Sequence, residues 1–492
     1  MDISWICSEA VPYAKTGGLA DVSASLPSAL ASRGDNVSVI MPYYPQVMGK
    51  LCERTEVCFE MLKVPFNWRT ELALIRKEVV SANLTYYFIE FNKFFDRPFL
   101  YDYYGDEFKD NADRFIFFSR AAMQAIEALN LNPDILHTND WHTALCNIYL
   151  KSDIYRYSET FQSCRSVLTI HNIGYQGVFH KDNLPKTGLS WDYFNYTCLE
   201  YYDQLNFLKG GILTADMVTT VSPTYAEEIL TPDYGFSLEG ALGHVHYHNR
   251  LKGILNGICT EEWNPQTDKL ITSNYNADNL AGKWICKEDL QEIMNLEINR
   301  DIPIVGVVSR FAYQKGIDVF ANALHSILEE EEIQVVVLGS GDPELEFHFS
   351  RYAADYPGKF GVYIGYDNTL AHKIEAGSDF FVMPSRYEPC GLNQMYSMQY
   401  GTLPIVRETG GLKDTVINYD KNNIDKSTGF TFLFLNEDAI INTLRWAIQV
   451  YNGNKGDFYR MVSNGMLKDF SWNHTAAEYE ELYQSALKVK SL

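Results

Sequence analysis

A chain of 492 residues is longer than one ordinary hydrophobic core supports, so its length favours two or three domains. Hydrophobic residues make up 46% and charged residues 21%, which is typical of globular proteins and excludes disordered and fibrous classes. Lysine and arginine number 41 against 63 acidic residues, and a net charge of −22 argues against nucleic acid and anionic membranes as partners.

Nine cysteines are scattered along the chain without a Cys-x-x-Cys pair, which favours neither a zinc site nor a disulfide framework. Reduced thiols are typical of the cytoplasm. The first residues, MDISWICSEA, lack the basic and apolar regions of a signal peptide, and no later stretch is apolar enough for a membrane span. We therefore expect a cytoplasmic protein.

Short apolar, β-branched runs alternate with amphipathic segments through the first half of the chain. The runs typical of buried strands are 3–7, 37–41, 135–137, 167–171 and 217–221. This alternation predicts an α/β fold with a parallel sheet, whose ligands bind beyond the carboxyl ends of the strands. The segment 94–113, rich in Tyr, Phe and Asp without clean periodicity, is predicted to be a long surface loop.

A second series of strands follows a stretch near 256–268 that contains proline and asparagine. Its runs are 304–308, 335–338, 361–364, 380–383 and 403–406. Two doubly wound domains are the simplest account. We place the first domain at 1–256 and the second at 257–472, and expect that 473–492 contains a helix that packs back on the first domain.

The motif Lys15-Thr16-Gly17-Gly18 follows the first predicted strand and opens an amphipathic helix that runs to about Arg33. Glycines let the backbone approach a ligand closely, and a helix start presents unpaired N–H groups to an anion. Lys15 adds a positive charge. An ordinary glycine turn between strand and helix explains the segment equally well.

The motifs HTNDWH, beginning at His137, and HNIGY, beginning at His171, follow two further strands. Polar and aromatic residues at neighbouring strand ends suit a sugar pocket, which needs hydroxyl partners and a flat apolar face. For each histidine alone a satisfied structural role is the simpler interpretation. Asp140 is also a normal N-cap residue for the helix that follows.

Arg310 and Lys315 lie on either side of another predicted strand-to-helix turn. Both can point at a diphosphate and stabilise the charge that develops on a leaving nucleotide. The sequence contains no Asp-x-Asp pair for chelating a metal, so we expect neither a metal ion nor another cofactor. Two solvated cations at a helix start are the alternative.

The segment PSRYEPCGLNQ follows the strand that ends near Met383. It places the Glu388 carboxylate at a strand end, where it can face a sugar, and Gly391 before a helix whose N–H groups can bind phosphate. By contrast, Gly339-Ser340-Gly341 has Glu344 where a dinucleotide fingerprint needs its third glycine, and it supports a nicotinamide cofactor only weakly.

Six motifs in this order resemble the bacterial glycogen synthase and starch synthase family: KTGGLAD, HTNDWH, HNIGYQG, VSRFAYQKG, PSRYEPCGLNQ and GTLPIVRETGGLKDTV. The resemblance extends from about Ile3 to Trp472. It implies a GT-B fold, with two Rossmann-like domains facing a deep cleft, and a retaining, metal-independent glucosyl transfer. The implied donor is ADP-glucose or UDP-glucose, with ADP-glucose favoured, and the implied acceptor is the non-reducing end of an α-1,4-glucan such as glycogen, starch or a malto-oligosaccharide.

The resemblance also implies roles for individual residues. The residues expected to carry catalysis are Glu388, Lys15, His171, Arg310 and Lys315. The residues expected to bind substrates are Gly17, Gly18, Asn256, Tyr366, Cys390, Gly391, Leu392, Asn393, Glu9, Asp21 and Asp140. Of these, Glu9, Asp21 and Asp140 are expected on the acceptor side, Asn256 in the glucose pocket with His171, and Tyr366 beside the nucleotide base.

Two positions depart from wider patterns. Many GT-B enzymes have a second glutamate eight positions after the first, where this chain has Tyr396, as the synthases do. Asn393 stands where the synthases usually have threonine, which leaves any side-chain contact with phosphate open.

The alternatives differ in what they require. A nicotinamide oxidoreductase needs a full glycine fingerprint and a ribose-binding acid, neither of which is found. A glucan phosphorylase needs a pyridoxal-binding lysine site that is not recognised. A non-catalytic glucan-binding protein, or a UDP-glucose-using enzyme of the same fold, stays open, as does association with glycogen or starch granules.

Overall fold

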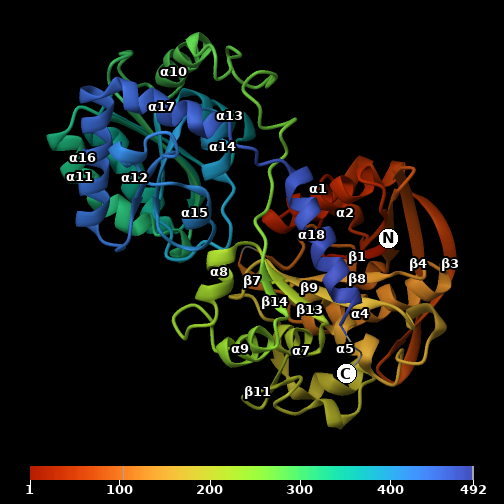
Figure 1. Ribbon diagram of the computed structural model, residues 1–492. Coiled ribbons are helices and arrows are strands. Elements are labelled where there is room, and N and C mark those ends of the chain that lie inside the picture. The colour runs from red at the N-terminus through yellow and green to blue at the C-terminus, as the bar shows by residue number, and fades with distance from the viewer. Residues whose placement is uncertain (104, 490–492) are drawn as a thin grey trace. The chain divides into compact units, whose positions relative to one another are not determined.

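The computed structural model describes residues 1–103 and 105–489. Tyr104, inside the predicted loop, and residues 490–492, inside the predicted C-terminal segment, lie outside the described residues. The chain forms two compact units (Figure 1). The first consists of residues 1–221 and 226–257 and of the segment that begins at Trp472, and the second of residues 222–225 and 258–471.

The described part of the first unit is built on a nine-stranded sheet. Its strands, in spatial order, are β14 (Leu251–Gly253), β13 (Met217–Thr220), β9 (Arg165–Ile170), β8 (Ile135–Asn139), β1 (Asp2–Ile6), β2 (Asn36–Pro42), β5 (Leu84–Glu90), β4 (Arg69–Ser81) and β3 (Glu56–Phe66). All neighbours are parallel except β3, β4 and β5, which form an antiparallel extension. The five predicted strands are confirmed, whereas the extension was missed because its partly exposed strands lack the buried apolar runs used for prediction.

Helices accompany this sheet. They are α1 (Gly18–Ser32), α2 (Pro45–Met48), α3 (Asn92–Phe95), α4 (Asn111–Ala128), α5 (Asp140–Lys151), α6 (Leu184–Thr187), α7 (Phe207–Thr214), α8 (Pro223–Glu228), α9 (Glu239–Tyr247) and α18 (Trp472–Leu487). Two small antiparallel sheets complete the described part of this unit. One pairs β6 (Asp102–Tyr103) with β7 (Asp106–Glu107), and the other contains β10 (Val178–His180), β12 (Gln204–Asn206) and β11 (Glu200–Tyr201), in that spatial order.

The last helix, α18, packs on α1 and β9 of the first unit (Figure 1). Arg33 at the end of α1 makes an ion pair with Glu480 at 2.8 Å. The Tyr483 hydroxyl lies 2.7 Å from Nδ1 of the buried His137. The final helix therefore completes the core of the first unit.

The segment 94–113 is mostly irregular and partly exposed, as predicted for a surface loop, but several of its apolar side chains are buried. Phe94, Phe95 and Leu100 are buried. The buried Arg114 guanidinium donates to the carbonyl oxygens of Phe94 and Leu100 at 2.9 and 2.7 Å, which satisfies backbone groups that irregular structure leaves unpaired. Apolar side chains that follow no helix or strand period therefore anchor this loop to the first unit.

The second unit contains a six-stranded parallel sheet within the described chain. Its spatial order is β17 (Phe360–Ile364), β16 (Gln334–Gly341), β15 (Ile304–Phe311), β18 (Phe380–Met383), β19 (Leu403–Arg407) and β20 (Phe430–Phe432). Its helices are α10 (Ala281–Ile293), α11 (Ile317–Glu330), α12 (Pro343–Asp355), α13 (Asn368–Gly377), α14 (Asn393–Gln399), α15 (Gly410–Thr415), α16 (Glu437–Gly453) and α17 (Lys455–Met466). Most strand residues are buried, as runs such as IVGVV predict, although β15, β16 and β17 become exposed toward their carboxyl ends. All five predicted strands are confirmed.

Within the described residues, none of the helices is both long enough and apolar enough to cross a lipid bilayer.

Candidate functional site

The predicted site residues form two groups, one in each unit. In the first unit, three adjacent strands, β9, β8 and β1, end beside one another. Asp140 and His171 directly follow β8 and β9, and Glu9 follows β1. Parallel strand order thus brings together residues that are far apart in sequence.

The loop before α1 is organised around the buried carboxylate of Glu9. Glu9 Oε2 accepts hydrogen bonds from the backbone N–H and the hydroxyl of Thr16 at 2.6 and 2.8 Å. Burial raises the pKa of Glu9 to about 7 despite these hydrogen bonds. Gly17 and Gly18 are exposed, and Lys15 Nζ pairs with Asp21 Oδ1 at 2.7 Å at the surface of α1. The loop presents an open backbone and a lysine held by a single exposed carboxylate.

Asp140 and His171 are directly linked. Asp140 has a left-handed backbone (φ 56°), and its Oδ1 accepts the backbone N–H of His171 at 2.8 Å. Burial raises the pKa of Asp140 to about 7 and lowers that of His171 to about 3. His171 Nε2 lies 2.9 Å from the side-chain oxygen of Asn139, so Nε2 carries the proton and Nδ1 is the acceptor of a neutral ring. This pair suits hydrogen bonding to sugar hydroxyls.

Two other polar side chains in this unit have different roles. His137 is fully buried, with both ring nitrogens bonded, to Tyr483 and Thr169, at 2.7 Å each, so the structural interpretation holds for it. Asn256 follows β14, and its buried Oδ1 accepts no hydrogen bond from any described residue. An unpaired buried acceptor is costly, and a ligand hydroxyl would satisfy it.

In the second unit, Glu388 and Lys315 meet in space although 73 residues separate them. Lys315 Nζ lies 2.6 Å from Glu388 Oε2, and the Ser385 hydroxyl donates to the same oxygen at 3.0 Å. Glu388 is only 5% exposed, and Lys315 is partly exposed. The pair lies beyond β18 and β15, at the carboxyl edge of the sheet.

Glycines allow the backbone turns around Glu388 to pack directly against one another. Gly316 has φ 63°, and a Cβ there would lie 2.0 Å from the carbonyl oxygen of Pro384. Gly410 has φ 44°, and a Cβ there would lie 1.9 Å from the carbonyl oxygen of Glu388. No other residue type fits such contacts, so the glycines set the position of the Glu388 loop.

The remaining predicted residues of this unit lie at or beyond the carboxyl ends of β15 and β17 or at the start of α14. Arg310 is exposed at the end of β15, and its guanidinium has no ion-pair partner among the described residues. Tyr366 is 73% exposed, and its hydroxyl donates to Asn368. Asn393 Nδ2 donates to the Val308 carbonyl at 3.0 Å, which ties its side chain to β15. Leading into α14 are Cys390, which is buried, Gly391, which has φ 72°, and Leu392.

Sequence reasoning missed the residues that hold these loops. Arg386 makes a bidentate pair with Asp318 at 2.7 and 2.6 Å and lies 3.9 Å from the Tyr313 ring centroid. Ser385 and Arg386 were quoted within a motif, but no local pattern names their partners. Ser385 donates to Glu388 of the same loop, whereas the partners of Arg386 come from the segment that follows β15 and are visible only after folding.

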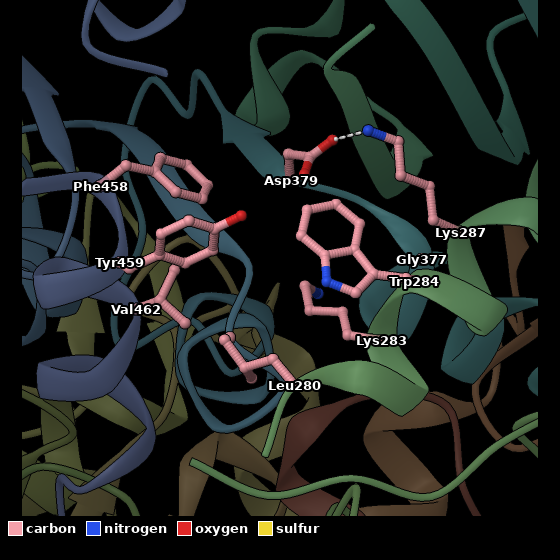
Figure 2. Close-up of a pocket in the computed structure, with 10 residues that line it drawn as sticks. Leu280, Lys283, Trp284, Lys287, Gly377, Asp379, Phe458, Tyr459 and Val462 are labelled. Carbon is pink, nitrogen blue, oxygen red and sulfur yellow. Dashed lines mark hydrogen bonds and ion pairs between the residues drawn. The ribbon is translucent and has the colours of Figure 1, made fainter. Parts of the chain in front are cut away.

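A small pocket in the second unit lies elsewhere (Figure 2). It is lined by residues that include Lys283, Trp284, Lys287, Asp379 and Tyr459, none of them a predicted site residue. Its volume of about 10 Å³ holds a single water molecule at most, so it is no sugar site. The described residues contain no cluster of three or more His, Cys, Asp or Glu side chains suited to a metal ion.

Comparisons with known proteins decide the family. Residues 2–244 match the family model of the starch synthase catalytic domain, and residues 290–455 match glycosyl transferases group 1. Glycogen synthase of Koribacter versatilis is 44% identical over 491 residues, which cover 100% of this chain and 99% of that protein. Glycogen synthase 1 of Geobacter sulfurreducens is 42% identical, covering 100% and 97%. The chain belongs to the glycogen and starch synthase family.

The solved catalytic domain of starch synthase IV from Arabidopsis thaliana, bound to ADP and acarbose, is similar to this synthase with a TM-score of 0.89 and 34% identity, covering 99% of each chain. The synthase therefore has the GT-B fold, as predicted. It is a hexosyltransferase, and the prediction of a glucosyltransferase that elongates glucans is confirmed.

Proposed function

We propose that this synthase transfers glucose from ADP-glucose to the non-reducing end of an α-1,4-glucan, with retention at the anomeric carbon and without a metal ion. The observation that carries the proposal is the contact of Lys315 with Glu388 at 2.6 Å, together with the exposed Arg310 five residues before Lys315. It joins two cations that suit a diphosphate with a carboxylate that suits a glucosyl group.

The donor side is assigned to the second unit. Arg310 makes no ion pair with an acidic side chain of the described residues, so no ion pair has to break before it binds phosphate. Lys315 exchanges the Glu388 carboxylate for the diphosphate when the donor binds, and Glu388 is then free to support the positive charge that develops on the glucosyl group. Leaving-group charge is stabilised by the two cations. Front-face attack assisted by the departing phosphate accounts for retention.

The first unit holds the residues assigned to the acceptor side, Glu9, Asp21 and Asp140, and two residues assigned to the glucose pocket, His171 and Asn256. The neutral ring of His171, the carboxyl groups of Asp140 and Glu9 and the unpaired oxygen of Asn256 are partners for sugar hydroxyls. Lys15 and the glycine loop are assigned to the diphosphate and the reacting sugar. These roles follow the family resemblance position by position.

The choice of nucleotide is supported by the starch synthase IV relative, whose structure contains ADP. UDP-glucose is the alternative donor. We place the reaction in the cytoplasm, which the scattered cysteines without a Cys-x-x-Cys pair support, with glycogen, starch or malto-oligosaccharides as acceptors.

The test is incorporation of radiolabelled glucose into precipitated glycogen, with ADP-glucose or UDP-glucose as donor, in buffer containing EDTA. We expect label from ADP-glucose at a rate that EDTA does not change. Label from UDP-glucose alone would overturn the donor assignment, and a rate restored only by added metal would overturn the metal-free mechanism. Glycogen binding without incorporation from either donor would favour a non-catalytic glucan-binding protein.

A further inference from the structure

One segment of the second unit contacts α13 and α14 at once, through four of its side chains. These side chains, which we call the brace, are Trp263, Asp268, Tyr275 and Lys283. None of them belongs to a predicted site motif. Each of the four bridges the two helices or the residues directly beyond them.

Trp263 is stacked between the two helices. Its ring lies parallel to that of His372 on α13, with centroids 3.8 Å apart and an interplanar angle of 13°. On its other side it is parallel to Tyr396 on α14, at 3.9 Å and 9°. Tyr396 occupies the position where many GT-B enzymes have a second glutamate, so in this chain that position packs the brace.

Asp268 adds a polar bridge under the stack. Its Oδ2 accepts hydrogen bonds from His372 Nδ1 at 2.7 Å and from the Tyr400 hydroxyl at 2.6 Å. His372 is fully buried and Asp268 nearly so. One carboxylate oxygen therefore links α13 to the residue that caps α14.

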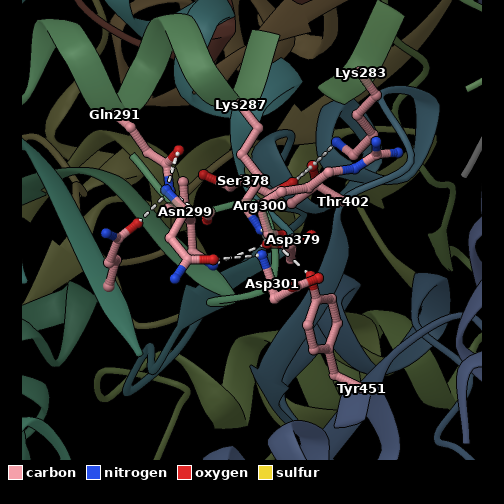
Figure 3. A network of polar contacts seen from close by, with 12 residues as sticks. Lys283, Lys287, Gln291, Asn299, Arg300, Asp301, Ser378, Asp379, Thr402 and Tyr451 are labelled. Atoms are coloured by element: carbon pink, nitrogen blue, oxygen red, sulfur yellow. Dashed lines mark hydrogen bonds and ion pairs between the residues drawn. The ribbon is translucent and has the colours of Figure 1, made fainter. Parts of the chain in front are cut away.

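Tyr275 and Lys283 both donate to the same two carbonyl oxygens, which end α13 and α14. The Tyr275 hydroxyl lies 3.4 Å from the Ala376 oxygen and 2.8 Å from the Tyr400 oxygen. Lys283 Nζ lies 3.0 and 2.9 Å from the same atoms, and its third bond goes to the Thr402 hydroxyl at 2.8 Å (Figure 3). A buried ammonium suits this place because helix ends carry unpaired carbonyls and partial negative charge.

Both braced helices begin at donor motifs. Tyr366 lies two residues before α13, and the loop that carries Glu388 runs directly into α14. Short helices transmit position along their length, so the distance between their ends also sets the distance between these two motifs. The Ser397 hydroxyl, which donates to Glu375 at 2.6 Å, couples the helices further.

We propose that the brace is a positioning element for the nucleotide sugar: it holds Tyr366 and the Glu388 loop at the spacing that one donor molecule needs. This inference rests on the proposed donor site. The brace residues act through α13 and α14, which separates them from the catalytic residues.

The test compares two tryptophans of the same unit. Trp263→Ala is expected to weaken ADP binding, measured by calorimetry, and to raise KM for ADP-glucose, each about ten-fold, because small displacements of a binding constellation are costly. KM for glycogen should stay within about two-fold, and Trp263→Phe, which retains a stacking ring, should restore ADP binding. Trp446→Ala is the control, since Trp446 also packs between aromatic rings, Phe430 and Tyr419, but on α16.

The outcomes separate the two proposals. Loss of ADP affinity in Trp263→Ala but not in Trp446→Ala, at similar loss of Tm, supports the brace. Unchanged ADP affinity in a folded Trp263→Ala overturns it. If that variant does not fold, Tyr275→Phe decides by the same measurement, with a drop in ADP affinity of about three-fold expected and no change overturning the inference. A wild-type protein that binds neither ADP nor UDP overturns the proposed function and the brace with it.

Discussion

Lys315 Nζ lies 2.6 Å from Glu388 Oε2, so a residue assigned to phosphate makes an ion pair with the residue assigned to glucose. Glu388 is buried and Lys315 partly exposed. An ion pair of this kind keeps both side chains in place, and it breaks when a diphosphate binds the lysine in place of the carboxylate. Arg310, which has no such partner, differs from Lys315 in what its loss should do.

Arg310→Ala and Lys315→Met should therefore separate activity from stability. Both should lower turnover by about 10²-fold, because each removes a cation from the leaving group. Arg310→Ala should change the free energy of unfolding by less than about 0.5 kcal/mol, as exposed substitutions do. Lys315→Met should cost about 1–3 kcal/mol because it leaves the buried Glu388 carboxylate unpaired. Urea unfolding with activity assays checks both, and equal stability losses would contradict the pairing argument.

Gly410→Ala should displace the Glu388 loop. The added Cβ would meet the Glu388 carbonyl oxygen at 1.9 Å in a backbone with φ 44°, so we expect a loss of at least about 2 kcal/mol in unfolding free energy together with loss of turnover. Gly453→Ala at the end of α16 is the matched control, because nothing lies within 4 Å of its Cβ position. That variant should be neutral or gain up to about 1 kcal/mol. Similar behaviour of the two variants in thermal unfolding would refute the close-packing account.

Glu375→Gln should change how stability depends on pH. Burial raises the pKa of Glu375 from 4.5 to about 8, so its contribution to stability is fully present below pH 4.5 and is lost as pH rises toward 8. The glutamine variant cannot ionise but can still accept the Ser397 hydroxyl. Its stability relative to wild type should thus increase from pH 5 to pH 8 in urea titrations. Glu437→Gln, on the exposed start of α16, should show no such trend.

Asp140→Asn should raise the stability of the protein and lower its activity. Burial raises the pKa of Asp140 to about 7, so ionisation costs stability as pH rises through that value, and an amide avoids the cost. Asparagine tolerates the left-handed backbone at φ 56° and retains an oxygen for the His171 N–H. We expect a higher Tm than wild type at pH 8, a smaller difference at pH 5, and lower glucosyl transfer. A Tm below wild type at both pH values would argue against a strained, functional carboxylate.

Much of the fold could be predicted because its signals are local. Runs such as Ile3 to Ile6 and Ile304 to Val307 are buried on both faces of a parallel sheet, so consecutive apolar residues indicate the burial. The antiparallel extension and the contacts that anchor the segment 94–113 were not predicted, since their packing depends on aromatic and polar contacts without a period.

In the candidate site, too, local features could be predicted and contacts between distant residues could not. Short motifs at strand ends, with glycines where the backbone must turn or approach closely, could be recognised before folding because strand, turn and helix start are neighbours in the chain. The partners of these residues could not be recognised from the sequence. Glu388 makes an ion pair with Lys315, Asn139 makes a hydrogen bond with His171, and Trp263 stacks between His372 and Tyr396. Sequence alone thus established the class of fold, the family and the positions of the motifs. The pairing of charges, the tautomer of His171 and the brace were settled by tertiary structure, because contacts between distant segments depend on strand order and side-chain packing that no local pattern encodes.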